Sequence, residues 1–168
     1  MKKIGIIIAT CALTSLAWAG NKDAKQTSTV VEFEKGTYEL TQSQKSSLSK
    51  MLRNNKTNEE LDVTIAAWAD EPFPAQRKNL SKEQRRIAKK RIKSIKSYLK
   101  NTGTDFDDME AYNMAERSGM MGRLFNSKGN KIKKSISSNN TSALKPTYQT
   151  IASKGDAGKA VLVFSIDD

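Results

Sequence analysis

The stretch that decides the fold is Leu61–Asp70, LDVTIAAWAD, followed after a proline-containing loop by Asn79–Leu99, NLSKEQRRIAKKRIKSIKSYL. The first segment alternates apolar residues with others in the period-two pattern of a strand. In the second, Ser81 with Gln84 three residues later forms a capping-box pattern, which predicts a long helix from there to about Lys100. A strand that ends on an acid and a helix that follows it can together hold a zwitterionic ligand.

One basic residue of this helix lies on its apolar side. At 100° per residue, the apolar side chains fall within one arc of about 140°, which we expect to face the sheet; they are Ile87, Ala88, Ile92, Ile95, Tyr98 and Leu99. The lysines of the helix lie outside this arc, whereas Arg91 lies inside it. A charge that faces the interior needs a partner or a ligand.

The rest of the chain predicts three more strands and one more helix. Residues 29–33 are rich in β-branched and aromatic side chains, and Thr41 with Gln44 caps a helix that runs to Asn54. Strands are also expected at residues 109–114 and 160–166, and the last is apolar on both faces, so we place it in the middle of the sheet. Strands that alternate with helices predict an α+β domain, with helices packed on a small mixed sheet.

The N-terminal residues indicate export. Lys2 and Lys3 precede an apolar run that ends in Ala17-Trp18-Ala19, the features of a secretory signal peptide over residues 1–19. The run is shorter than the ~20 residues of a spanning helix, so a membrane anchor is disfavoured and no transmembrane segment is expected once the signal is removed. Lipid modification of Cys11 is a second alternative. We expect residues 20–28 to be a flexible lead-in and residues 29–168 to form one domain, with 114–150 as an enlarged segment.

Composition excludes several kinds of site. The chain has no histidine, and its single cysteine, Cys11, lies in the signal, so Ser-His-Asp triads, Cys-His pairs, His-ligated zinc and disulfides are all excluded from the exported domain. No cofactor is indicated. The formal net charge of +11 favours anionic partners such as cell-wall polymer or lipid head groups. Because the lysines are spread without interleaved aromatic residues, specific nucleic-acid binding is not expected.

Asp70 and Arg91 form the sharpest candidate site. A carboxylate at a strand end accepts hydrogen bonds from a ligand ammonium, and a guanidinium makes a bidentate contact with a ligand carboxylate. The pair therefore fits an amino-acid-like group. A direct salt bridge between Asp70 and Arg91, with no ligand, is the alternative that the residues leave open.

The sequence resembles the OmpA-like peptidoglycan-binding domain family. The resemblance is carried by Val31–Gly36 (VEFEKG), Val63–Asp70, Leu80-Ser81 and the stretch from Arg91 through Tyr98-Leu99. It implies an OmpA-like β-α-β-α-β-β sandwich, and it implies that Asp70 and an arginine of the following helix hold the diaminopimelate group of the peptidoglycan stem peptide. Counting back from Tyr98-Leu99 gives Arg91 for that role.

Two further site residues follow from the same comparison. The count forward from Leu80-Ser81 falls on Gln84, seven residues or two helical turns before Arg91, so both counts point to one face. Arg85 keeps a family-like interval from Asp70 and is the second choice for the ligand arginine, and Asn79 lies near the position of the family's loop asparagine.

The function expected is that of a periplasmic or cell-envelope binding module without enzymatic activity. Its expected partner is diaminopimelate-containing peptidoglycan, with other envelope proteins as further partners. The alternatives are a domain of the same fold without the ligand site, acting in protein interaction or structure, and a carboxylate-based wall hydrolase using Asp70, Glu71 and Glu116.

Overall fold

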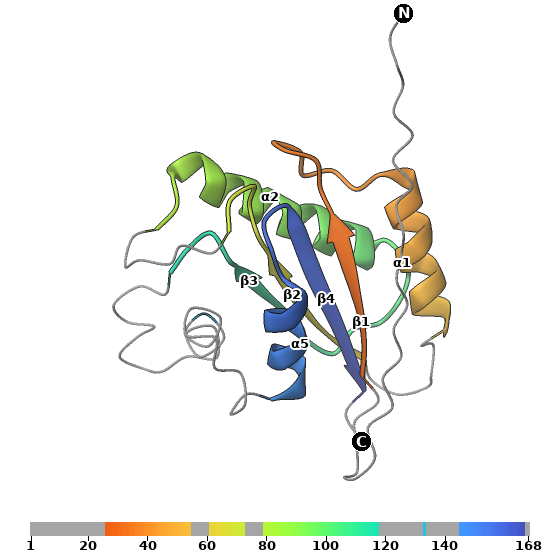
Figure 1. Ribbon diagram of the computed structural model, residues 1–168. Helices are drawn as coiled ribbons and strands as arrows, with labels where there is room; N and C mark the ends of the chain where they lie inside the picture. The colour runs from red at the N-terminus through yellow and green to blue at the C-terminus, as the bar shows by residue number, and fades with distance from the viewer. Residues whose placement is uncertain (1–25, 55–60, 73–78, 118–132, 134–144, 167–168) are drawn as a thin grey trace, which may run out of the picture.

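The computed structural model describes residues 26–54, 61–72, 79–117, 133 and 145–166 (Figure 1). The expected signal peptide and the first part of the expected lead-in lie outside these residues. So does most of the enlarged segment between residues 114 and 150.

Four strands form one mixed sheet in the order β1-β4-β2-β3. Strand β1 (Gln26–Glu32) and strand β2 (Leu61–Ala67) both pair antiparallel with β4 (Lys159–Ile166), and β3 (Met109–Asn113) pairs parallel with β2. The C-terminal strand is therefore central, as its two apolar faces predict. Along the chain the elements follow the expected β-α-β-α-β-β order, with one additional helix before the last strand.

Two helices cover one face of the sheet: α1 (Gln42–Asn54) and α2 (Lys82–Lys100) (Figure 1). Both begin as the sequence predicts, since Gln44 N donates to Thr41 Oγ1 and Gln84 N donates to Ser81 Oγ, each at 3.2 Å. Their buried stripes meet one face of the sheet, and the core there includes Leu48, Met51, Leu52, Ile95, Leu99, Leu162 and Phe164.

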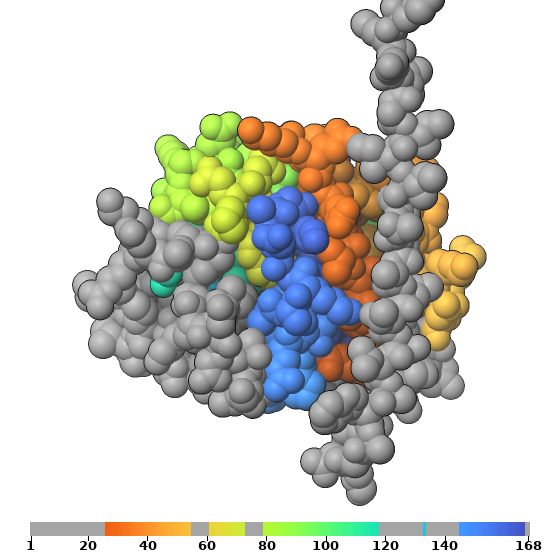
Figure 2. All heavy atoms as spheres, viewed as in Figure 1, coloured from red at the N-terminus to blue at the C-terminus, as the bar shows by residue number. Residues whose placement is uncertain are grey.

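The opposite face is covered by a helix that the sequence did not predict, α5 (Pro146–Lys154). Its buried Tyr148 and Ile151 pack against Trp68, Met114, Val161 and Val163. Figure 2 shows α5 in blue lying on the near side of the molecule beside β1. Residues 146–150, which the sequence analysis includes in the enlarged segment, thus belong to this second layer.

Element boundaries differ from expectation by a few residues. Strand β1 starts at Gln26 rather than Thr29, because Gln26, Thr27 and Ser28 pair with Ser165, Phe164 and Val163 of the central strand. Three residues of the segment assigned as a flexible lead-in are therefore strand. Trp68, just after β2, has only 2% of its surface exposed, so it belongs to the core.

Within the described part of the chain, no helix is both long and apolar enough to cross a membrane.

Candidate functional site

The candidate site lies where the parallel strands β2 and β3 end. The chain leaves β2 through Trp68 and Ala69, both buried, and reaches Asp70. The capped N-terminus of α2 lies beside this point, because Asp70 N donates to Gln84 Oε1 at 2.9 Å. In the sequence, Gln84 completes the capping-box pattern with Ser81; in the structure its side chain fixes the backbone at Asp70 instead.

Arg91 lies two turns further along the same helix, and its side chain contacts Asp70. Seven residues separate it from Gln84, which is close to two turns and places both on one face. The guanidinium Nη2 lies 2.5 Å from Asp70 Oδ1. The sequence-based placement of Arg91 toward the interior is confirmed, because the residue is fully buried, with 0% exposed surface.

The other bonds of Arg91 go to backbone carbonyls. Nη1 donates to Trp68 O at 2.8 Å, Nε donates to Thr37 O at 2.9 Å, and Nη2 also donates to Glu34 O at 3.3 Å. The guanidinium carbon lies 4.8 Å from the centre of the Phe33 ring, within the range of a cation–π contact. The side chain thus ties the end of β2 to the turn that follows β1.

Asp70 is held from the same turn. Gly36 N donates to Asp70 Oδ2 at 2.7 Å. Gly36 has φ +76°, a conformation that glycine adopts without the steric cost that other residues incur. Both carboxylate oxygens therefore have a donor, and the Asp70 side chain is only 7% exposed. A carboxylate has about four lone-pair positions, so the Asp70 carboxylate retains capacity to accept further hydrogen bonds.

The structure does not bring the other two predicted site residues into this network. Asn79 Oδ1 accepts from Arg117 N at 2.8 Å, in the segment that follows β3. Arg85 is half-buried, its carbonyl accepts from Asn113 Nδ2 at 3.0 Å, and its buried Nε has no hydrogen-bond partner in the part of the chain that the structure describes. Arg85 therefore differs from Arg91 in having an unengaged guanidinium nitrogen.

The groups that sequence reasoning missed are mostly backbone atoms. The carbonyls of Glu34, Thr37 and Trp68 belong to the backbone, so no pattern of side chains identifies them. The forward count from Leu80-Ser81 places Gln84 on the same helix face as Arg91. In the structure the Gln84 side chain accepts a hydrogen bond from Asp70 N.

The described residues hold no group of three or more His, Cys, Asp or Glu side chains that would ligate a metal. Of the carboxylates considered for wall hydrolysis, Asp70 is bound to Arg91 and Gly36, Glu71 is exposed and Glu116 is half-buried.

No family model and no curated protein matches this chain. Among solved structures, it is similar to the OmpA-like domain of FopA1 from Francisella tularensis subsp. tularensis SCHU S4, with 12% identity and a TM-score of 0.45 over 93% of this chain and 80% of that one. It is also similar to the periplasmic domain of Helicobacter pylori MotB, with 11% identity and a TM-score of 0.44 over 94% and 88% of the two chains. The α+β architecture described above rests on this chain's own strand order and helix packing.

Proposed function

We propose that the protein is a non-enzymatic binding module of the cell envelope that attaches noncovalently to peptidoglycan through the diaminopimelate group of the stem peptide. The observation that carries the proposal is the Asp70 carboxylate at the end of β2, whose oxygens accept from Arg91 and Gly36 while Gln84 accepts from the backbone N–H of the same residue. The proposal includes a periplasmic location, which the secretory-signal features of residues 1–19 support.

The roles of the two arginines follow from their surroundings. Arg91 is fully buried and bonded to four protein acceptors, so its role is to position Asp70. The Asp70 carboxylate then takes the ligand ammonium. Arg85, on the first turns of the same helix, is the second arginine of the candidate site, and we assign it to the ligand carboxylate.

A second candidate function has its own supporting observation. Because Arg91 has no exposed surface and already neutralises Asp70, the pair also fits a fold that has no ligand site and acts as a protein-interaction or structural element. In that case the ion pair only fixes the turn after β1 to the end of β2.

Sedimentation with purified sacculi separates the two. We expect the wild-type protein to pellet with sacculi, free diaminopimelate to release it, and free lysine to release it much less, since lysine lacks the second carboxylate. No soluble wall fragments should appear. A folded wild-type protein that stays in the supernatant would establish the second candidate and overturn the first.

Two neighbouring arginines provide a matched pair of variants. Arg85→Gln and Arg86→Gln remove the same charge from adjacent positions of α2, but Arg86 is exposed. We expect Arg85→Gln to weaken pelleting and Arg86→Gln to leave it near the wild-type level. Equal effects would show that net charge, and not a defined site, governs the association.

A further inference from the structure

The two helices that cover one face of the sheet are strongly and one-sidedly charged. Together α1 and α2 contain twelve basic residues and a single acid, Glu83. Arg91 points inward, whereas most of the others are exposed, and the exposed ones are Lys50, Arg53, Lys82, Arg86, Lys89, Lys93 and Lys100. We call these exposed residues, together with Lys45, the basic helical face.

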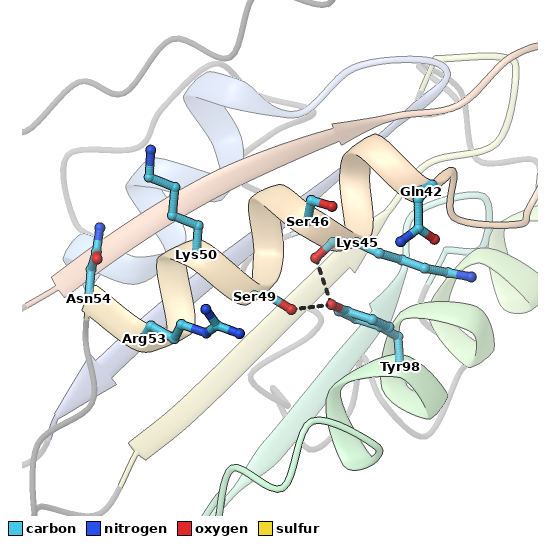
Figure 3. A pocket seen from close by; sticks show the side chains of 8 residues that line it. All are labelled: Gln42, Lys45, Ser46, Ser49, Lys50, Arg53, Asn54 and Tyr98. Atoms are coloured by element: carbon cyan, nitrogen blue, oxygen red, sulfur yellow. Dashed lines mark hydrogen bonds between the residues drawn. The ribbon is translucent and has the colours of Figure 1, made fainter.

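A hollow of about 500 Å³ lies within the basic helical face, against the side of α1. Lys45, Lys50 and Arg53 line it together with polar side chains and the ring of Tyr98 from α2 (Figure 3). Helix α1 contains no acidic residue to neutralise these three cations.

The floor of the hollow is fixed by hydrogen bonds between the helices. Tyr98 Oη donates to Lys45 O at 2.6 Å, so the Ser49 hydroxyl, also 2.6 Å from Tyr98 Oη, is the donor of that second bond (Figure 3). Both hydroxyl protons are therefore used within the protein. The donors that face the hollow are the cationic side chains at the rim, the side-chain amides of Gln42 and Asn54, and the exposed hydroxyl of Ser46.

We propose that the basic helical face docks onto an anionic phospholipid surface, with one lipid phosphate seated in the hollow beside Lys45, Lys50 and Arg53. A broad, predominantly positive layer on two adjacent helices matches a surface that presents many phosphates, and each Lys or Arg held near such a surface contributes about fivefold to affinity. Long basic side chains also extend toward the charge while their stems stay on the protein. The proposal does not depend on Asp70 or on peptidoglycan.

Vesicle co-sedimentation tests the proposal. The full exported chain is mixed with vesicles of phosphatidylcholine alone or with about 30% phosphatidylglycerol, at low salt and at about 0.5 M NaCl. We expect binding only to the anionic vesicles and release at high salt. Absence of binding to the anionic vesicles would overturn the proposal, whatever the result with sacculi.

A pair of double variants distinguishes a defined face from net charge. Lys50→Gln with Arg53→Gln removes two charges from the basic helical face, and we expect about a 30-fold loss of vesicle affinity. The control is Lys145→Gln with Lys159→Gln. It removes one charge at the start of α5 and one at the start of β4, and we expect its vesicle affinity to fall by less than about threefold. Equal losses would contradict docking through this face. Binding to dextran sulfate but not to anionic vesicles would contradict the assignment to lipid.

Discussion

Arg91 brings a full charge into the interior of the domain. Transfer of an ion out of water costs several kcal/mol even after the protein relaxes, so such a residue is stable only when its charge and its N–H groups are all engaged. Here the guanidinium donates four hydrogen bonds and lies against an aromatic ring. Three of the acceptors are backbone carbonyls, and the fourth is the Asp70 carboxylate. The acceptors lie in different directions around the side chain. Arginine can reach them with donors on three nitrogens, whereas lysine carries all its donors on one nitrogen.

We therefore expect Arg91→Ala to be severely destabilising. It leaves Asp70 charged, nearly buried and without its counter-ion, which costs about 3–5 kcal/mol in the free energy of unfolding. Arg91→Lys should recover only part of this loss. Urea denaturation measures both, with Lys93→Ala, an exposed position of the same helix, as the control that should change stability by less than about 0.5 kcal/mol. A loss below about 1 kcal/mol for Arg91→Ala would show that the buried pair contributes little.

Tyr112, on β3, is the residue whose surroundings change its acidity most clearly. Burial raises the pKa of its phenol well above the ordinary value, and the hydrogen bond that it donates to Glu110 Oε2 at 2.7 Å raises this pKa further. Its ring also packs edge-on against Tyr148, with ring centres 6.5 Å apart. The folded protein thus keeps this proton at alkaline pH.

A stability loss at high pH follows from this raised pKa. The phenol ionises near pH 10 in the unfolded chain but not in the folded one, so the stabilisation is fully present below about pH 10 and is lost as pH rises toward the folded pKa. Above about pH 10 the free energy of unfolding should fall as pH rises, by at most about 1.4 kcal/mol per pH unit, which is the limit for one proton. Tyr112→Phe should flatten this decline in denaturation curves taken between about pH 9.5 and 11. An unchanged slope in the variant would assign the alkaline loss to other groups.

At the scale of elements, the sequence predicted α2 well and α5 not at all. Helix α2 has a cap at Ser81 and a long apolar stripe, so its face and the inward position of Arg91 follow from periodicity alone. Helix α5 is nine residues long and buries only Tyr148 and Ile151, too few positions for a period to be recognised. Pro146 at its first turn and Gly155 after its last residue were the available signals.

The candidate site was predictable to a similar, partial extent. Its two charged side chains lie at positions that pattern can find, a strand end and an apolar helix face. The turn after β1 supplies the carbonyls of Glu34 and Thr37. They can accept hydrogen bonds from Arg91 only once β1 and β2 have paired with β4 on either side of it. Long-range placement of this kind is not contained in local periodicity.

Gly155, at the end of α5, lies close to the ring of Trp68. A Cβ atom at this position would lie 1.9 Å from Cη2 of the Trp68 ring, which is buried. The backbone at Gly155 is extended, with φ −81°, so the constraint is the ring and not the conformation. The short helix α5 is thus connected to the sheet through a contact that only glycine permits.

We expect Gly155→Ala to cost about 1–3 kcal/mol in the free energy of unfolding, because the ring or the helix must move. Combining it with Trp68→Leu should reduce this penalty, since the smaller side chain leaves room for the methyl group. Thermal or urea unfolding of the two single variants and the double variant measures the coupling, and Ser153→Ala, on an exposed position of the same helix, serves as the control. Additive losses would show that the glycine and the indole do not constrain each other.

At the scale of the whole molecule, the sheet joins the two ends of the described chain. Residues 26–32 pair with residues 159–165, so the sheet is completed only when the last strand inserts between β1 and β2. The buried clusters on both faces of the sheet include β4, because Leu162 and Phe164 face the core under α1 and α2 while Val161 and Val163 face α5. The two faces are therefore expected to unfold together.

This arrangement predicts a distinct pattern of amide hydrogen exchange. Backbone amides of β4 are bonded or covered on both sides by neighbouring strands and both faces are buried, so they should open only with global unfolding and exchange most slowly. Amides of the edge strand β3, whose residues are all half-buried, should exchange faster, as should those of the short helix α5. Native-state exchange followed by NMR or mass spectrometry at several urea concentrations tests this ranking. If β4 exchanged as fast as β3, the closing strand would be an independently opening unit, and the two faces of the sheet would not form one cooperative domain.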